Sequence, residues 1–336
     1  MKLAAIKLDR VKSDNDLRVL ILILVFFLAS LAASVVFASD PAGSLSSPAQ
    51  GVTPSAPPKI KATYTSYYYD FDGTKGSANN LYNFGHASLS MQLLSLEYQA
   101  TPTWTLMAIG TYLVDEVETY YRPLPTLAFK SDDITRGFGD TVVSAVHPFY
   151  FNGPFMAIVD FGASLPTGSI DEKNKALLTR NYAYNFQNGS GTYDGIIGLT
   201  SLWLKPSYQL GSRLSADIRT GQTNDGYRLG NLYKLDAWLD YPLAAGFIPR
   251  LVGYYKHKDA ILGADSTEPR DANTEVYYHP EIDWQVAASL KYQHSFGNSF
   301  SLGGEFGVPL AQDCQNSDDV IVSTNYFADI FVSGRF

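Results

Sequence analysis

His86 and Ser88 are the two residues whose types and spacing could most directly carry out chemistry. Two residues apart on one strand, their side chains share a face, and the imidazole could accept the serine proton for attack on an acyl ester. Ala87 and Leu89 begin the apolar set of the same strand, which predicts that the pair faces a polar interior. No evident Asn or Asp lies on a neighbouring strand to orient the imidazole. We interpret the pair as polar interior residues, with hydrolysis as an alternative.

Metal chemistry is not indicated by the remaining candidate ligands. None of the histidines lies in a spacing that is typical of a zinc site or of a HExxH helix. The sequence therefore predicts no metal and no cofactor. The five histidines are His86, His147, His257, His279 and His294.

The segments that must position these residues alternate between apolar and polar residues with a period of two. The last strand alternates from Tyr326 through Ile330 to Phe336 between apolar or small and polar residues, and the segments 154–165, 231–242 and 281–294 do the same. One apolar and one polar face is typical of a strand between lipid and a polar interior. The sequence predicts an all-β fold, a transmembrane antiparallel β-barrel.

Segments of this kind recur along the chain at about the length of a tilted membrane-spanning strand. We count about twelve. They lie at 61–71, 85–99, 103–115, 138–149, 154–165, 192–204, 212–221, 231–242, 249–258, 281–294, 299–309 and 325–336.

Short and long connections between these segments alternate, as in a bacterial barrel with short periplasmic turns and long extracellular loops. An even strand number leaves both termini on the short-turn side. The sequence therefore predicts that 325–336 pairs with 61–71, because an open seam would leave backbone groups unpaired in lipid.

The N-terminus predicts export. Residues 1–38 combine a basic start with an apolar run and small residues, which is typical of a signal peptide. An uncleaved anchor is the alternative for this segment. Residues 39–60 are rich in Pro, Ser and Ala and predict a periplasmic lead-in, and 61–336 predicts the barrel. Without 1–38 the chain keeps 20 of its 25 bases and 30 of its 33 acids, a charge near −10, which disfavours nucleic acid as a partner.

Parity predicts a set of charged side chains that project into the interior. Acids and bases are similar in number, so the set would either form ion pairs across a narrow interior or line a wet pore. The predicted inward residues are Asp160, Arg213, Asp217, Arg219, Lys234, Asp236, Asp240, Lys256, Asp283, Lys291, Glu305, Asp329 and Arg335.

The connection 116–137 is unusually apolar for a solvent-exposed loop. We predict that it folds over or into the mouth of the barrel and forms a hydrophobic site there. The residues expected to form this site are Tyr120, Tyr121, Leu124, Leu127 and Phe129. The acidic pairs at 132–133 and 318–319 lie in predicted external loops and could bridge to lipopolysaccharide through divalent ions.

Two short motifs resemble a known family. Gly137-Phe138-Gly139-Asp140 and Leu165-Pro166-Thr167-Gly168, with Leu235 to Leu243 before a later turn, resemble the outer-membrane family named for the meta-pathway of phenol degradation. The resemblance covers 61–336. It implies a channel or transporter for small hydrophobic or aromatic compounds in the outer membrane of a Gram-negative bacterium, and no catalytic residues.

Two other functions stay open. One is a general or cation-preferring porin, because the negative charge could concentrate cations at the loops. The other is a hydrolase, since His86 and Ser88 are similar in part to the pair of the outer-membrane phospholipase. The expected partners are outer-membrane lipid and lipopolysaccharide, a small hydrophobic or aromatic ligand and, through the terminal Phe336, the barrel-assembly machinery.

Overall fold

A computed structural model describes most of the chain from Ile60 onward. The described residues are 60–73, 82–124, 127–174, 180–181, 187–263, 277–278, 281–297, 299–315 and 322–336. The predicted signal peptide and most of the predicted lead-in, together with His279 and the acidic pair at 318–319, lie outside these residues.

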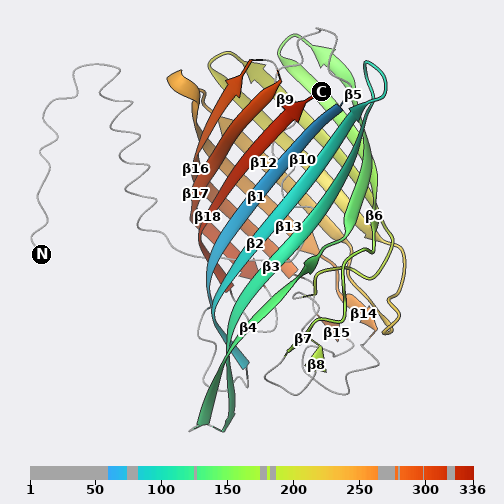
Figure 1. The fold of residues 1–336 in the computed structure, drawn as a ribbon, viewed down its shortest axis with the longest axis vertical. Helices are drawn as coiled ribbons and strands as arrows, with labels where there is room; N and C mark the ends of the chain where they lie inside the picture. Colours follow the sequence, from blue (N-terminus) through green and yellow to red (C-terminus); the bar gives the residue numbers. More distant parts are fainter. Residues whose placement is uncertain are drawn as a thin grey trace, which may run out of the picture.

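Twelve antiparallel strands form a closed barrel, as predicted (Figure 1). Their order round the wall follows the chain, and closure comes from the pairing of the first strand with the last. The barrel strands are β1 (Ile60–Gly73), β2 (Tyr82–Gln99), β3 (Thr105–Leu124), β5 (Thr141–Asn152), β6 (Phe155–Leu165), β9 (Asp194–Lys205), β10 (Tyr208–Arg219), β12 (Leu232–Asp240), β13 (Phe247–Lys258), β16 (Glu281–Phe296), β17 (Phe300–Gln315) and β18 (Val322–Arg335).

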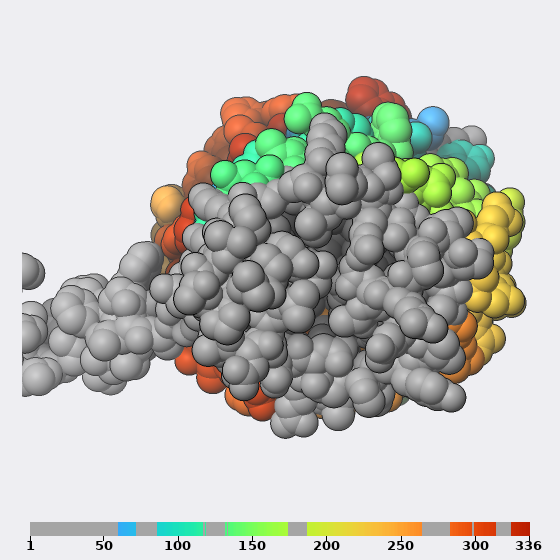
Figure 2. All heavy atoms as spheres, turned by 90° about the horizontal axis from the view of Figure 1, so that it is seen from below, coloured from blue at the N-terminus to red at the C-terminus, as the bar shows by residue number. Residues whose placement is uncertain are grey.

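The remaining described elements are short, apart from β4 (Leu127–Phe138). Figure 1 shows β7, β8, β14 and β15 at the end of the barrel that carries the long connections, and Figure 2 looks onto this end. Within the described part of the chain, no helix is long and apolar enough to cross a membrane. The short elements are β7 (Lys173–Asn174), β8 (Arg180–Asn181), β11 (Tyr227–Arg228), β14 (Ile261–Gly263), β15 (Tyr277–Tyr278) and the 3-10 turn η2 (Ala244–Gly246).

The predicted seam between the first and last strands is confirmed. Lys61 pairs with Arg335 at one end of the seam, and Gly73 pairs with Val322 at the other. The backbone N–H of Phe336 donates to the carbonyl of Ile60 at 2.9 Å. The start of β1 and the C-terminus lie together at the short-turn end (Figure 1). Every strand of the wall therefore has a hydrogen-bonded neighbour on both sides.

Inward and outward faces alternate as predicted in most strands. In β12, Leu235 and Leu239 are 47% and 41% exposed on the outer face, while Asp240 is 6% exposed on the inner face. Strand β2 contradicts the prediction. Its register pairs Met91 with Tyr67 on the inner face of β1, so its apolar set points inward. The prediction failed because it took the apolar face of each strand for the outer one, and β2 carries apolar residues on both faces.

We predicted that the connection 116–137 is a loop that closes the mouth. This prediction is wrong, because the connection forms a β-hairpin. Strand β3 runs on past the barrel wall and pairs with β4 from Tyr112↔Phe138 to Leu124↔Leu127. Figure 1 shows the hairpin projecting away from the barrel end. The acidic pair at 132–133 lies in β4, not in a loop. The physical reason is that paired strands satisfy their own backbone groups, so the apolar segment continues the ladder of β3.

Gly211 on β10 faces Trp238 on β12 directly across the inner wall. A Cβ on Gly211 would overlap the indole ring, whereas a Cβ on Gly195 in β9 would meet no atom within 4 Å. We predict that Gly211→Val lowers the free energy of unfolding by about 1–3 kcal/mol through overpacking. The control Gly195→Val should leave it nearly unchanged. Both effects are measured by the temperature at which each variant loses its heat-modifiable gel migration. Equal effects of the two changes would contradict the packing described.

Candidate functional site

One side of the barrel interior is apolar. We call this surface the apolar wall, and it is built from inward residues of β1, β2 and β3. Each residue of its buried core is at most 9% exposed, so these side chains pack against one another instead of facing a wide aqueous space. The core comprises Tyr67, Phe71, Ala87, Leu89, Met91, Leu93, Ile109 and Leu113, with Tyr69, Met107 and Val142 packed against it.

Three aromatic rings form a ladder along this wall. Tyr67, Tyr69 and Phe71 alternate on β1, so all three project inward. The rings of Tyr67 and Tyr69 are stacked at 6.4 Å and 17°, and those of Tyr69 and Phe71 at 6.0 Å and 10°. Parallel rings at this spacing present a continuous aromatic surface.

The part of the barrel wall from β6 to β17 carries ion pairs between inward-facing residues. Arg213 donates to both carboxylate oxygens of Asp160, at 2.6 and 2.8 Å. Asp240 accepts from Arg250 at 2.7 Å, and the same guanidinium donates to Glu305 at 3.2 Å. These pairs lie across neighbouring or nearby strands, and they neutralise charges that burial would otherwise disfavour.

The other residues of the predicted inward set are placed as follows. Lys256 lies 3.4 Å from Asp283, and both are buried. Arg219 pairs with Asp194 at 2.5 Å. The Lys291 ammonium lies 5.7 Å from the ring of Phe331. Arg335 is exposed at the short-turn end. The remaining members lie on inner faces and are buried or half-buried; they are Asp217, Lys234, Asp236 and Asp329.

Sequence reasoning missed two members of this ion-pair network, Arg250 and Asp194. Arg250 has the same parity as the predicted Lys256, and it lay at the edge of the predicted strand. Asp194 is the first residue of β9 and is buried. Extending the inward face of this strand by twos from Lys256 towards its start would have identified Arg250. The apolar wall was missed for the reason already given for β2.

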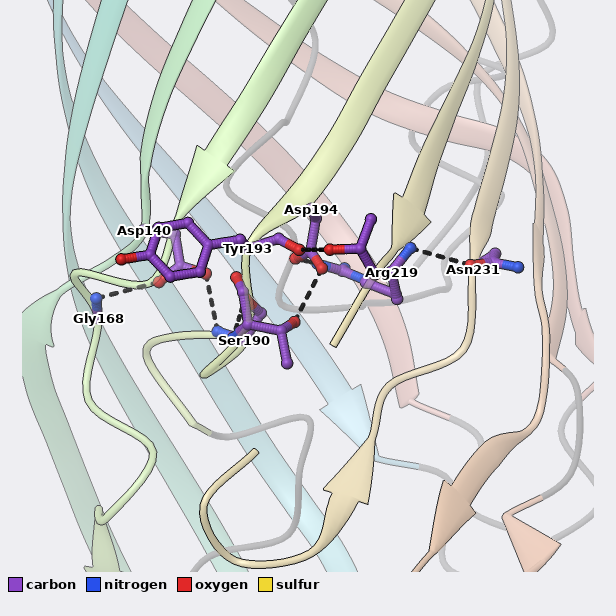
Figure 3. Close-up of polar contacts among 9 residues, drawn as sticks. Asp140, Gly168, Ser190, Tyr193, Asp194, Arg219 and Asn231 are labelled. Atoms are coloured by element: carbon purple, nitrogen blue, oxygen red, sulfur yellow. Dashed lines mark hydrogen bonds and ion pairs between the residues drawn. The ribbon is translucent and has the colours of Figure 1, made fainter. Parts of the chain in front are cut away.

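The carboxylate of Asp140 holds residues 187–193, which we call the mouth segment, against the barrel (Figure 3). It accepts the backbone N–H of Gly168 at 3.0 Å and that of Ser190 at 2.8 Å. Burial raises the pKa of the Asp140 carboxyl above its ordinary value, and the hydrogen bonds from Ser190 and Gly168 oppose that rise. We call this arrangement the mouth clip. It joins the two motifs that carried the family resemblance, 137–140 and 165–168.

Glycines allow the close approach that the clip requires. A Cβ on Gly168 would lie 2.6 Å from the Cα of Gly189, and a Cβ on Gly189 would meet the backbone of Gly168 in turn. Thr167 adds a hydrogen bond from its hydroxyl to the carbonyl of Gly139 at 3.0 Å. Two backbone segments are thus packed directly against each other beside Asp140.

The hydrogen bonds continue from the clip round the rim (Figure 3). The Thr192 hydroxyl donates to Asp194 at 2.8 Å, and Arg219 pairs with the same carboxylate. The backbone N–H of Arg219 donates to Asn231 at 2.9 Å, and the Asn231 amide donates to Asp259 at 3.0 Å. The mouth segment is therefore tied to β9, β10 and the strands beyond them.

His86 and Ser88 point outward, which contradicts the prediction. They share the parity of Leu94, which is 51% exposed on the outer face, because the apolar residues between them fill the inner face. The expectation that no acid lies nearby was also wrong. The His86 imidazole lies 3.4 Å from the carboxylate of Asp70 on β1, and Asn325 donates to that carboxylate at 2.9 Å. Within the described part of the chain, the Ser88 hydroxyl makes no hydrogen bond.

The predicted hydrophobic mouth residues are placed by their backbone. Tyr120, Tyr121 and Leu124 lie in β3, and Leu127 and Phe129 lie in β4, so all five belong to the projecting hairpin. Among the described residues, no group of three or more His, Cys, Asp or Glu side chains could hold a metal ion.

Comparison with known proteins identifies the architecture and a family. The family model described as Putative MetA-pathway of phenol degradation matches residues 73–308. The structure of an outer-membrane channel from Pseudomonas putida F1 superposes with a TM-score of 0.54 at 13% identity, covering 85% of this chain and 100% of that one. No curated protein matches the sequence.

Two further structures resemble the chain more weakly. The NanC porin has a TM-score of 0.40 at 10% identity, over 81% of this chain and 100% of that one. A Pseudomonas aeruginosa FadL homologue has a TM-score of 0.39 at 10% identity, over 82% and 89%. The Pseudomonas putida channel is thus similar to this chain in fold.

The mouth clip predicts a local effect of substitution. Asp140→Ala removes the acceptor of two backbone N–H groups, so we expect cleavage by added protease to become faster between 187 and 193, with a loss of stability of about 1–3 kcal/mol. Asp140→Asn, which keeps one acceptor oxygen, should lie between Ala and the wild type. The exposed Asp171 supplies the control, since Asp171→Asn should change neither measurement. Protection of 187–193 that is unaltered in Asp140→Ala would rule out the clip.

Proposed function

The chain belongs to the phenol-degradation MetA-pathway family, and we propose on this basis that it is an outer-membrane channel for small hydrophobic or aromatic compounds. The observation that carries the proposal is the apolar wall with its aromatic ladder. An apolar molecule that crosses a barrel needs an inner surface that is as apolar as itself, because a hydrated lining would favour polar solutes. Stacked rings offer such a surface to aromatic solutes in particular.

The setting proposed for this channel is the outer membrane of a Gram-negative bacterium. Outward-facing side chains such as Leu210, Leu214 and Phe306 are about half exposed, which suits contact with lipid tails. Phe336 is 77% exposed at the short-turn end, which would leave it accessible to the barrel-assembly machinery. Lipopolysaccharide would then surround the end that carries the long connections.

A general or cation-preferring porin is the alternative within transport. Such a pore needs hydrated charges along an open lining. Here the clearest inward charges are already paired, as in Asp160–Arg213 and Asp240–Arg250, and the apolar wall is buried. These features support a selective route over a wide aqueous one.

Tyr69 is the central ring of the ladder and therefore tests the proposal. Tyr69→Thr interrupts the stack, whereas Tyr69→Phe keeps it. We expect the concentration of benzyl alcohol that halves the single-channel current in planar bilayers to rise about fivefold in Tyr69→Thr, in line with the worth of one aromatic contact. Tyr69→Phe should resemble the wild type. Equal behaviour of the two variants would count against the aromatic route.

Ester hydrolysis at the outer face is a second candidate, favoured by one observation, the contact between His86 and Asp70. Histidine beside a carboxylate and near a serine is the arrangement of an acyl-transfer site. A serine nucleophile, however, needs a hydrogen bond to its base, and the hydroxyl of Ser88 is without one among the described residues. We propose that the chain is not an enzyme.

Hydrolysis of p-nitrophenyl esters by the refolded chain separates these two functions. We expect the wild type and Ser88→Ala to show the same background rate, because the serine is not activated. The matched variant Ser90→Ala, two residues further along the same outer face, controls for surface changes. A rate that falls more than tenfold in Ser88→Ala and in His86→Ala, but not in Ser90→Ala, would establish the hydrolase instead.

A further inference from the structure

Among the described residues, three polar side chains at the mouth end of the apolar wall are buried without hydrogen bonds. The Asn188 amide is 2% exposed, and neither its nitrogen nor its oxygen has a partner in the described part of the chain. The Thr135 hydroxyl, 5% exposed, likewise has no partner among these residues. Asp115 is 9% exposed, and within the described part of the chain no donor or cation contacts its carboxylate. Burying polar groups without hydrogen bonds destabilises a protein, so each of these groups calls for an explanation, and contact with a polar ligand supplies one.

The three groups share one inward surface. Asp115 on β3 lies directly opposite Thr135 on β4, and Gly137 is the next inward residue of β4. The Asn188 amide covers Gly137, because its nitrogen lies 2.6 Å from the point where a Cβ on Gly137 would be. Successive inward residues of a strand are about 7 Å apart. The polar groups are therefore close enough to meet one small ligand.

The mouth clip fixes Asn188 in this position. Ser190, two residues further on, donates its backbone N–H to Asp140 at 2.8 Å. The carbonyl of Asn188 lies 3.4 Å from the Cβ position of Gly139, so this segment runs close over the end of β4. The amide is thus positioned by backbone contacts at Asn188 and Ser190 and does not depend on hydrogen bonds of its own side chain.

The apolar wall begins directly beside these groups. Leu113 lies two residues before Asp115 on the same inner face of β3, and it pairs in register with Met91 of the wall. A molecule whose polar end reached Asp115, Thr135 and Asn188 would place its body against Leu113 and the ring ladder. The two surfaces together match an amphiphile with one polar end.

We propose that Asp115, Thr135 and Asn188 bind the hydroxyl group of a small apolar alcohol at the mouth end of the apolar wall. This assignment rests on the proposed function, since it names the substrate class of the same route. A hydroxyl both donates, to the Asp115 carboxylate, and accepts, from the Asn188 amide. An ammonium group has no acceptor for that amide, and a carboxylate has no donor for Asp115 and is repelled by it. A hydrocarbon would leave all three groups unpaired.

The test is single-channel block of the refolded full chain by benzyl alcohol, benzylamine and benzoate. In the wild type we expect benzyl alcohol to block at a concentration at least about tenfold lower than the other two. Thr135→Val, which keeps the side-chain shape, and Asn188→Leu should each raise the half-blocking concentration of benzyl alcohol about five- to tenfold. Benzoate block should not change. The control Thr65→Val, which removes another buried inward hydroxyl, should leave benzyl alcohol block as in the wild type.

Each outcome is decisive. Wild-type preference for benzyl alcohol that is lost in Thr135→Val but kept in Thr65→Val supports the site, even if Asn188→Leu fails to fold. Equal block by the three compounds, or block unaltered in Thr135→Val and Asn188→Leu, overturns it. If Tyr69→Thr still weakens block in that case, the proposed channel stands and only the polar site fails. A wild type that no aromatic compound blocks overturns both.

Discussion

The closed hydrogen-bond ladder is the constraint on which the rest of this structure depends. Lipid offers no partner to a backbone N–H or carbonyl, so a strand in contact with it must be paired on both sides. The seam between β1 and β18 meets this condition, and its side chains join as well, with Thr63 donating to Ser333 at 3.1 Å. Once the ladder is closed, parity alone decides which side chains face inward. The interior is thus a consequence of register.

Within that interior the apolar wall lies on β1, β2 and β3, whereas β6 to β17 combine ion pairs with a second buried apolar cluster of Met156, Ile158, Leu202 and Trp238. The pairs join strands through charge-assisted hydrogen bonds, which makes that side of the barrel well suited to hold its shape. The apolar wall offers a packed apolar and aromatic surface instead.

The sequence allowed the barrel to be predicted because two independent signals agreed, alternation within strands and alternation of short and long connections. Both depend on local residues, and the seam followed from the even strand number. Facing was predictable where one face was polar, as around Asp236, and failed in β2, where Leu93 and Leu94 are neighbours on opposite faces. The mouth clip was beyond prediction for another reason. Asp140 and Ser190 lie 50 residues apart, and no local pattern states that they meet. Arg250 was within reach, since parity with Lys256 places it inward.

The two strands of the projecting hairpin join the barrel in different ways. Its first arm, β3, is continuous with the barrel wall, but its second arm ends at Phe138 and passes into the wall through Gly139 and Asp140. Asp140 is also the residue that holds the mouth segment by its backbone. The hairpin is therefore joined to the barrel by an unbroken strand on one side and by Gly139 and Asp140 on the other. Asp140 thus connects the hairpin, the barrel wall and the mouth segment at one place.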